Sequence, residues 1–589
     1  DGMAQACTRA LTISLDEAQM PPETIGYLET HGSGHPGEDQ AEYRALQNVF
    51  STQTTPLALG ALKACLGHAG AAAGLAGLAK TVLCLHQQML PAMPHYQAPP
   101  GTVSVPDHIH IPLRPAFWPT NRTAEPRRAC LNALTGEGNA MAVVLEEAPA
   151  DPLVGSRDSL QMSPAGVPDH GLFIVEGENQ GQLETVLNQL ASHIQQTRAS
   201  DKSIGVAAQE WFRRHQTNSA LPCALAFSLA DYDDFEKAYQ GARNAIRSGT
   251  AITLDGQTGC HFTPQPLGPS HQPALVYPGS GNHYVGMGRQ LSVQWPQIWR
   301  NANQSTDRFA DQCRSAALVP YRSEWQSGWR KESLAAINAD PVTTIYGQVV
   351  YGCLMTDLLR YLGVVPSAVI GYSLGETVGY FATGAWPDRG QMLERLEASD
   401  LFQTQLAGTC LAARQALPIP EDAPVDWRVA VINRPGAFVR EKLIDFPTVR
   451  LLITNSPDES VIGGSGPAVE TAIRHMACDA VYLDGVVAVH CEAVNPVAGA
   501  YRNLHRFPTT PSPGIAYYSC AEERRIDLTT DTAADSLLKQ ATNGFDFPAT
   551  IKQAHADGIR LFLEVGPQGS CTRMIRRILD GAPHRALTV

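Results

Sequence analysis

The chain has 589 residues, of which 44% are hydrophobic, and a formal net charge of −13 at pH 7. This length corresponds to about three to four domains and is ample for burying hydrophobic cores. The acidic balance argues against nucleic acids and anionic membrane surfaces as partners, since both attract basic proteins.

Cysteine usage and short motifs narrow the class of protein further. The 13 cysteines show no paired spacing, which favours reduced thiols and a cytoplasmic location. Neither Cys-x-x-Cys nor His-Glu-x-x-His occurs, so we expect no metal site. The apolar stretch 69–85 contains Lys80 and is too short to span a bilayer, so we expect no membrane partner.

The first predicted elements carry two histidines. A strand at 25–30 leads directly to His31, and the segment 62–74 places His68 just before a helix of small residues. A glycine-rich loop then precedes a closing strand at 142–145. Strand ends and helix starts are common positions for residues that take part in chemistry.

These motifs resemble the C-terminal half of a β-ketoacyl synthase. The resemblance implies a thiolase-like fold for residues 1–150, in which His31, His68 and Lys63 match residues that serve decarboxylative condensation. The glycine-rich loop 134–141 departs from the family's pattern, and the half that would hold the nucleophilic cysteine is not in the sequence. We therefore expect these three residues to be a relic, without ketosynthase activity from this chain.

A proline- and glycine-rich joint at 148–168 follows, and then a small α/β segment. The periodicity predicts strands at 172–175 and 223–228 and helices at 182–197 and 231–248. Residues 151–270 resemble the linker domain that joins synthase and acyltransferase in large synthases, which implies a spacer without chemistry of its own.

The most informative stretch is Gly371-Tyr-Ser-Leu-Gly-Glu376, which follows an apolar run at 364–370 and precedes a helical pattern at 377–385. A strand that turns into a helix through Gly-x-Ser-x-Gly exposes the serine hydroxyl beside free backbone N–H groups. This geometry suits Ser373 as a nucleophile. A turn that merely contains a serine also fits such a motif.

Two other segments support the nucleophile. His490 ends the apolar, strand-like run 486–490 and could act as the base that a serine needs at neutral pH. Upstream, a predicted strand breaks into the glycine-rich loop 278–283. The backbone N–H groups of Ser280 and Leu374 could bind a developing oxyanion.

Together with 455–464 and Leu563-Glu-Val-Gly-Pro567, these motifs resemble the acyltransferase domain of fatty acid and polyketide synthases, from about residue 274 to the C-terminus. The resemblance implies a ping-pong transfer of an acyl group from a coenzyme A or carrier-protein thioester to Ser373, then to a phosphopantetheine thiol. His490 would be base and then acid, oriented by a backbone carbonyl. Asn455 would lie on a loop near the substrate.

The fold expected from these resemblances is α/β and multidomain. It comprises half of a thiolase-like domain (1–150), a small α/β linker (151–270) and an acyltransferase domain (271–589). The last has a parallel-sheet, hydrolase-like core and a ferredoxin-like subdomain at about 407–484. We expect no bound cofactor, because the acyl thioester is itself the substrate.

The sequence departs from the acyltransferase pattern at positions that are expected to contact the substrate. Tyr372 stands where the family has a histidine before the nucleophile. Malonyl-type members carry an arginine that pairs with the substrate carboxylate, and the position counted without gaps is Ala398, with Arg395 one helical turn away. A buried carboxylate without its arginine would be poorly compensated. We therefore expect a non-carboxylated acyl group.

The domain order looks most like the acyltransferase subunit of bacterial polyunsaturated fatty acid synthases, which implies acyl carrier proteins and other synthase subunits as partners. Three alternatives stay open. An α/β-hydrolase would need a late pair such as Asp580 and His584. A thioesterase would use the same acyl-serine, and a scaffold protein of the synthase would keep Ser373 as a relic.

Overall fold

The computed structural model describes residues 2–99, 105–121, 126–135, 137–148, 169–218, 220–253, 258–268, 270–419, 425–485 and 487–589. The chain divides into two compact units, residues 1–157 with 273–589, and residues 158–272. Most of the predicted joint at 148–168, with the boundary between 150 and 151, lies outside the described residues. The prediction of an α/β multidomain chain is confirmed.

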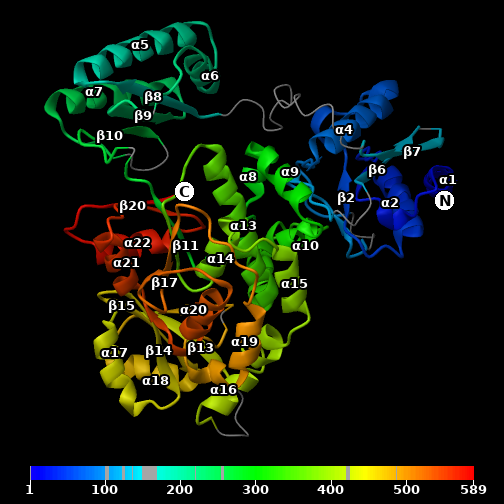
Figure 1. Ribbon diagram of the computed structural model, residues 1–589. Coiled ribbons are helices and arrows are strands. Elements are labelled where there is room, and N and C mark those ends of the chain that lie inside the picture. The colour runs from blue at the N-terminus through cyan, green and yellow to red at the C-terminus, as the bar shows by residue number, and fades with distance from the viewer. Residues whose placement is uncertain are drawn as a thin grey trace. The chain divides into compact units, whose positions relative to one another are not determined.

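The N-terminal part of the first unit is a five-stranded sheet in the order β4-β2-β1-β6-β7 (Figure 1). Its strands are β1 (Tyr27–Glu29), β2 (Leu57–Gly60), β4 (Ile109–His110), β6 (Arg128–Leu134) and β7 (Ala140–Glu146). Leu28 packs with α1 (Gly2–Ala18) and α2 (Pro36–Phe50), whereas Tyr27 packs with α4 (Ala73–Gln87). Neighbouring residues on a strand point to opposite faces, so helices cover both sides of this sheet.

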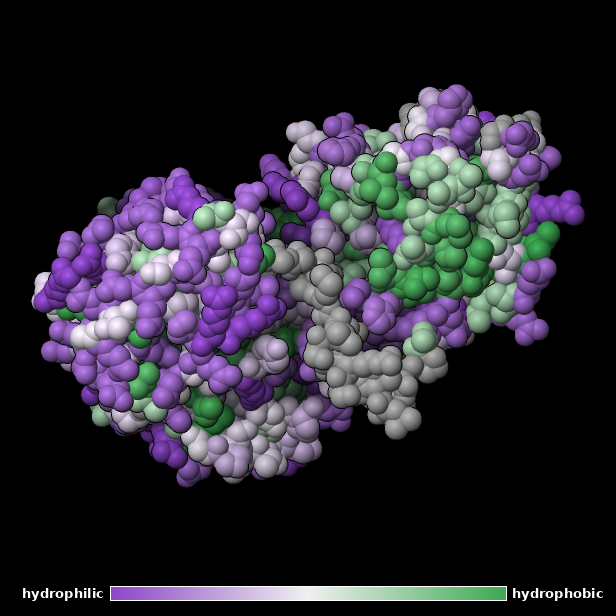
Figure 2. Space-filling model, turned by 90° about the horizontal axis from the view of Figure 1, so that it is seen from above, coloured by the Kyte–Doolittle hydropathy of each residue, from purple (hydrophilic) through white to green (hydrophobic). Residues whose placement is uncertain are grey.

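Hydrophobic side chains gather on one face of this part of the molecule, as Figure 2 shows. On α4 and the edge strand β7 the large exposed side chains are Leu75, Val82, Leu83, Met141 and Val143. The small-residue helix predicted from the sequence therefore buries only one of its faces among the described residues.

The C-terminal part of the same unit is built on a six-stranded sheet in the order β18-β17-β12-β11-β20-β21. The strands are β11 (Ala274–Tyr277), β12 (Ala368–Gly371), β17 (Ala516–Ser519), β18 (Arg524–Ile526), β20 (Leu561–Glu564) and β21 (Arg585–Thr588). All neighbouring pairs are parallel except β17 with β18. One core packs α13 (Pro341–Tyr361) on this sheet, and a second packs α21 (Phe547–Ala556) and α22 (Ser570–Ile578). Strands β11 and β12 are buried throughout, which is typical of a parallel sheet covered on both faces.

A second, smaller sheet has the order β16-β13-β15-β14-β19. Its first four strands are β13 (Trp427–Ile432), β14 (Val449–Ser456), β15 (Glu459–Ser465) and β16 (Ala480–Leu483), with α17 (Gly436–Lys442) and α18 (Gly466–Met476) between them. This βαββαβ order is the predicted ferredoxin-like arrangement. Its fifth strand, β19 (Phe545–Asp546), lies beyond the predicted range 407–484.

The first and third predicted domains pack into one compact unit. Met89 of β3 (Met89–Leu90) and Phe117 of β5 (Ala116–Phe117) belong to the same hydrophobic core as Tyr277 and helix α13. The Phe117 backbone N–H also donates to the hydroxyl of Ser292, at 3.1 Å, on α8 (Arg289–Gln294). The end of the synthase-like part is therefore a structural element of the acyltransferase-like part.

The second unit is a three-stranded antiparallel sheet, β10-β9-β8, with its helices packed in one core. It comprises β8 (Gly171–Gly177), α5 (Gln180–Ala199), α6 (Ile204–Arg214), β9 (Cys223–Leu229), α7 (Tyr232–Ser248) and β10 (Gly259–Phe262). Helix α6 and strand β10 were not predicted from the sequence. Helix α6 buries Trp211, whose indole N–H donates to the Ile174 carbonyl.

All 13 cysteines are free. Among the described residues, no helix is both long enough and apolar enough to cross a membrane.

The junction between β12 and α14 (Gly375–Ala382) leaves no room for a side chain at Gly375. A Cβ there would lie 1.9 Å from the carbonyl oxygen of Tyr277 on β11. We expect Gly375→Ala to destabilise this unit by about 1–3 kcal/mol or more, because the helix must move away from the sheet. Urea denaturation followed by circular dichroism measures this.

Gly499→Ala is the matched control, since a Cβ at Gly499 in α19 (Ala498–Leu504) meets no atom within 4 Å. It should leave the urea midpoint unchanged or raise it, because alanine favours helix. Equal midpoints for the two variants would contradict the packing argument.

Candidate active site

Ser373 lies at the sharp turn between β12 and α14, with a left-handed backbone φ of 55°. Non-glycine residues seldom adopt this conformation, and it is held only where the surroundings enforce it. Gly371 makes the turn possible, because a Cβ there would lie 2.0 Å from the Glu376 nitrogen. The strand, turn and helix expected from the sequence are therefore present, although the helix begins at Gly375 rather than Thr377.

The hydroxyl of Ser373 and the Nε2 of His490 are 2.8 Å apart. On the other side of the ring, Nδ1 lies 2.9 Å from the carbonyl oxygen of Gln540 on α20 (Thr530–Asn543). Because a carbonyl can only accept, Nδ1 carries the proton and Nε2 is free to accept from the serine hydroxyl. The arrangement is a nucleophile, a base and a backbone group that fixes the tautomer of the base.

His490 is buried, and burial lowers the pKa of this imidazole to about 4. The ring is therefore neutral at pH 7, as a base must be. The prediction that His490 lies on a strand was wrong. Its φ is 68°, and the neighbouring Ala488 and Cys491 N–H groups donate to the carbonyls of Leu406 and Ala541 rather than to a strand.

Ser280 and Leu374, the predicted oxyanion donors, both line the cavity around Ser373. Among the described residues, neither backbone N–H has a protein acceptor. A Cβ on Gly279 would lie 3.2 Å from the Ser373 Cβ, so only glycine lets this loop approach the nucleophile closely. Two free amides beside an activated hydroxyl are the components of an oxyanion hole.

The cavity has a volume of about 130 Å³ and lies between the two sheets of the C-terminal part. Its wall is mainly apolar, with contributions from Ile345, Met392, Phe402, Leu452, Val461 and Val489. None of the described residues that line it is Asp, Glu, Lys or Arg. Such a cavity suits a small uncharged group.

Tyr372 and Asn455 connect the turn to the smaller sheet. The Tyr372 hydroxyl donates to Asn455 Oδ1 at 2.6 Å, and the Asn455 amide donates to Glu459 at 2.9 Å. The Tyr372 ring is packed edge-on against Phe545 and Phe547. Tyr372 lines the cavity. The prediction of Asn455 on a loop beside the substrate was wrong, because Asn455 lies on strand β14 and reaches the cavity only through Tyr372.

The structure corrects the prediction that Ala398 contacts the substrate. Ala398 is the exposed C-cap of α15 (Arg389–Glu397) and does not line the cavity, because the helix turns this position to solvent. Arg395 is also engaged elsewhere. Its guanidinium lies over the Phe507 ring and donates to three backbone carbonyls, those of Asn503, Leu504 and Arg506.

Two residues of the site were missed by sequence reasoning. Gln540 supplies the carbonyl that orients His490, and its side chain donates to the Ser373 carbonyl at 3.3 Å. Glu376 is buried and accepts from Tyr380 and Ser536 at 2.8 and 2.5 Å. Burial raises the pKa of Glu376 to about 7. A carboxylate inside an apolar helix was the available sequence signal for Glu376.

The residues of the two other predicted sites lie apart from Ser373. His31, His68 and Lys63 line a separate cavity of about 260 Å³, with Lys63 Nζ 3.3 Å from His31 Nδ1 and the two rings 5.7 Å apart. None of the described residues that line it is a cysteine. His584, the alternative hydrolase base, contacts the Ala582 carbonyl and is not part of the Ser373 cavity. Among the described residues no cluster suits a metal ion.

Known proteins resemble the whole length of this chain. Residues 1–97 match the family model of the β-ketoacyl synthase C-terminal domain. The chain is 26% identical over 588 residues to a phenolphthiocerol/phthiocerol polyketide synthase of Mycobacterium tuberculosis, covering 97% of this chain and 28% of the relative. It is 25% identical over 601 residues to a mycocerosic acid synthase-like polyketide synthase of Mycolicibacterium smegmatis, covering 98% and 25%. The chain thus spans about a quarter of the length of these relatives.

Solved structures show a similar fold. The acyltransferase domain of SpnD, in complex with 2-(pent-4-yn-1-yl)malonyl, gives a TM-score of 0.52 at 17% identity, covering 72% of this chain and 91% of that one. The acyltransferase domain from module 8 of the salinomycin polyketide synthase gives a TM-score of 0.53 at 16% identity, with the same coverage. Residues 1–97 are therefore similar to the C-terminal domain of β-ketoacyl synthases, and the C-terminal part of the chain has the fold of these acyltransferase domains.

Proposed function

We propose that the chain is an acyltransferase that moves an acyl group from a coenzyme A or carrier-protein thioester, through Ser373, to a phosphopantetheine thiol. One observation carries this proposal. The Ser373 hydroxyl, the His490 ring and the Gln540 carbonyl form a continuous hydrogen-bonded chain at the wall of an apolar cavity.

In the first half-reaction His490 Nε2 takes the proton of the Ser373 hydroxyl as its oxygen attacks the thioester carbonyl carbon. The N–H groups of Ser280 and Leu374 stabilise the negative charge that develops on the carbonyl oxygen. When the intermediate collapses, the C–S bond breaks and the protonated His490 gives its proton to the leaving thiolate. The product is an ester on Ser373 and a free thiol.

The second half-reaction runs the same steps in reverse with a different thiol. His490 removes the proton of the phosphopantetheine thiol, the sulfur attacks the acyl-serine carbonyl, and the C–O bond breaks. The proton returns from His490 to the Ser373 oxygen. A thioesterase differs only in the acceptor, since water would take the place of the thiol.

The acyl group we propose carries no carboxylate. None of the described residues that line the cavity is Lys or Arg, and Arg395 is committed to backbone carbonyls and Phe507. A carboxylate in this cavity would lose its hydration without gaining a partner.

The larger assembly we propose is a cytoplasmic polyunsaturated fatty acid or polyketide synthase, in which acyl carrier proteins deliver or receive the acyl group. The order of synthase-like part, linker and acyltransferase-like part, with Gly-Tyr-Ser-Leu-Gly-Glu at the turn, supports the first of these. The free thiols support a reducing compartment.

Brief incubation with acetyl-, malonyl- or long-chain acyl-coenzyme A should produce an acyl adduct on Ser373 that intact-mass spectrometry detects. We expect an uncharged acyl group to load at least about tenfold faster than malonyl, because the malonyl carboxylate stays uncompensated. Ser373→Ala should give no adduct, and addition of a phosphopantetheinylated carrier should discharge the wild-type adduct onto the carrier.

Preferential malonyl loading would overturn the substrate class. An adduct that decays to free acid at the same rate with and without carrier would identify a thioesterase. If no donor gives an adduct, the scaffold alternative holds.

Ala398→Arg tests the corrected position of this residue. Because Ala398 is exposed and outside the cavity, we expect malonyl loading to stay within about twofold of wild type, and a basic residue at a helix C-terminus is tolerated. A marked gain in malonyl loading would show that position 398 reaches the acyl group.

The pH dependence follows from His490. Its pKa is lowered to about 4 by burial, so the neutral base persists as pH falls through the usual histidine range. We expect kcat/KM for Ser373 acylation to fall through protonation of His490 only as the pH drops through about 4. A midpoint near the ordinary histidine pKa of about 6.5 would contradict this assignment.

The same shift affects stability, so folding must be followed in parallel by circular dichroism. Between about pH 6.5 and 4 the unfolded chain binds a proton at His490 and the folded chain does not, so this group lowers stability as pH falls. Rates are compared only where the protein remains folded.

A further inference from the structure

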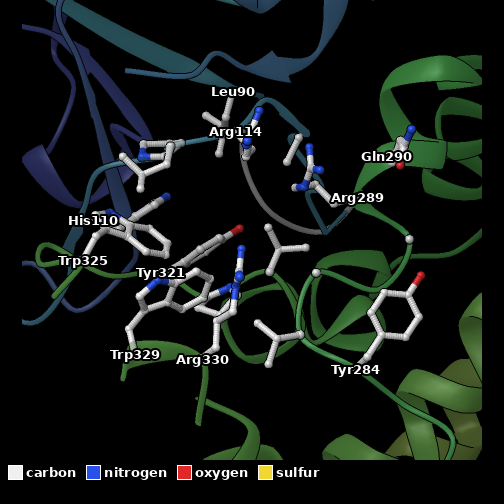
Figure 3. Close-up of a pocket in the computed structure, with 18 of the residues that line it drawn as sticks. Leu90, His110, Arg114, Tyr284, Arg289, Gln290, Tyr321, Trp325, Trp329 and Arg330 are labelled. Atoms are coloured by element: carbon white, nitrogen blue, oxygen red, sulfur yellow. The ribbon is translucent and has the colours of Figure 1, made fainter. Parts of the chain in front are cut away.

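A second and larger cavity, of about 720 Å³, lies where the end of the synthase-like part meets the start of the acyltransferase-like part (Figure 3). Residues 110–116 form one side, and the loops and helices of 284–294 and 319–330 form the other. The volume is within the range of small-molecule and cofactor sites, about 300–1,000 Å³. Neither proposed half-reaction uses this cavity.

Three arginines surround it. Figure 3 shows Arg114 and Arg289 close together on one side and Arg330 opposite them. Arg289 donates to the Pro115 carbonyl, and Arg330 lies over the Trp329 ring, but none of the described residues that line the cavity is Asp or Glu. In an acidic chain this is an unusual gathering of unneutralised positive charge.

The other part of the wall is aromatic. The rings of His110 and Tyr321 are stacked, with centroids 3.9 Å apart, and Trp325 and Trp329 meet edge-on at 4.7 Å. His110 is buried, and among the described residues neither of its ring nitrogens has a hydrogen-bond partner. Buried polar groups are normally satisfied, so His110 is an unsatisfied polar group behind the aromatic wall of the cavity.

Hydrogen bonds between the synthase-like part and the acyltransferase-like part shape the cavity before any ligand binds. The Trp325 indole N–H donates to the Ile111 carbonyl at 2.9 Å, and the Ile111 N–H donates to the Arg322 carbonyl at 2.8 Å. The Trp325 backbone N–H donates to the Gln97 carbonyl. The aromatic and basic walls are thereby held at a fixed separation, which lowers the cost of ordering a ligand between them.

We propose that this cavity binds a nucleotide, with its phosphates on Arg114, Arg289 and Arg330 and its base against the aromatic wall. Guanidinium groups bind phosphate oxygens through paired hydrogen bonds. Aromatic side chains stack on a nucleobase whichever base it is, because every base has a flat π-face. Inorganic phosphate would contact the three arginines alone, and an uncharged aromatic ligand would contact the aromatic wall alone.

A free nucleotide and the nucleotide end of coenzyme A share this chemistry. Isothermal titration calorimetry of the full chain with ADP, adenosine 3′,5′-bisphosphate, coenzyme A and inorganic phosphate distinguishes them. ADP, the bisphosphate and inorganic phosphate take no part in the proposed transfer at Ser373, and the arginine variants described below locate the binding of coenzyme A.

We expect ADP or adenosine 3′,5′-bisphosphate to bind more tightly than inorganic phosphate. Arg114→Gln with Arg330→Gln should weaken binding by about tenfold or more, because charge-assisted hydrogen bonds are lost. Both arginines are exposed at the cavity, so the variant should keep the wild-type thermal midpoint. Arg360→Gln is the matched control, since Arg360 is an exposed arginine that pairs with Asp357 and does not line the cavity.

Coenzyme A binding more tightly than the bisphosphate would identify the coenzyme as the source, and the reverse order would identify a free nucleotide. Either order supports the proposal if the double arginine variant weakens binding by about tenfold or more and Arg360→Gln does not. Absence of nucleotide binding, equal binding of phosphate and nucleotide, or insensitivity to the arginine pair would each overturn it.

Discussion

The contact between the His490 ring and the Gln540 carbonyl sets the state of the whole Ser373 site. It fixes the proton on Nδ1, so that Nε2 faces the serine hydroxyl as an acceptor. The contact joins distant segments, since Ser373 follows β12, Gln540 lies on α20 and His490 lies in the irregular segment after β16. The packing of α20 against the turn, reinforced by the Gln540 side chain on the Ser373 carbonyl, is therefore part of the chemistry.

Burial gives this site two opposite electrostatic consequences. It keeps His490 neutral, which a base requires, and it raises the pKa of Glu376 towards neutrality. Both shifts have the same cause, because a low-dielectric interior disfavours whichever form is charged. The Glu376 carboxyl nevertheless keeps two hydroxyl donors, Tyr380 and Ser536, and so ties α14 to α20 beside the nucleophile. The buried region around His490 is thus held together by hydrogen bonds between groups that are themselves buried, those of Tyr380 and Ser536 with Glu376.

Ser373 and its turn could be predicted because strand, turn and helix are encoded within a dozen neighbouring residues. The distant residues His490 and Ser280 were candidates from their own local motifs, and the ferredoxin-like subdomain was expected only from the family resemblance. Gln540 could not be found in this way, since every residue has a carbonyl and only the fold selects one. The prediction for Ala398 was wrong for a related reason. Counting positions along the sequence does not determine which side of a helix faces the cavity. The cavity at 110–116 and 319–330 depends on two segments far apart in the sequence, as the Trp325 to Ile111 contact shows.

The two cavities differ in the charge that they can accept, and this difference constrains any ligand of the chain. The wall around Ser373 has no ionised side chain among its described residues, whereas the wall at 110–116 and 284–330 gathers three guanidinium groups. An anionic group placed in the first would lose hydration without compensation, and an alkyl chain placed in the second would separate the arginines from water without pairing them. A thioester donor has both kinds of group, with an acyl chain at one end and phosphates at the other. In the transfer proposed above, only the acyl end would lie beside Ser373, and the phosphates of the donor would stay outside that cavity.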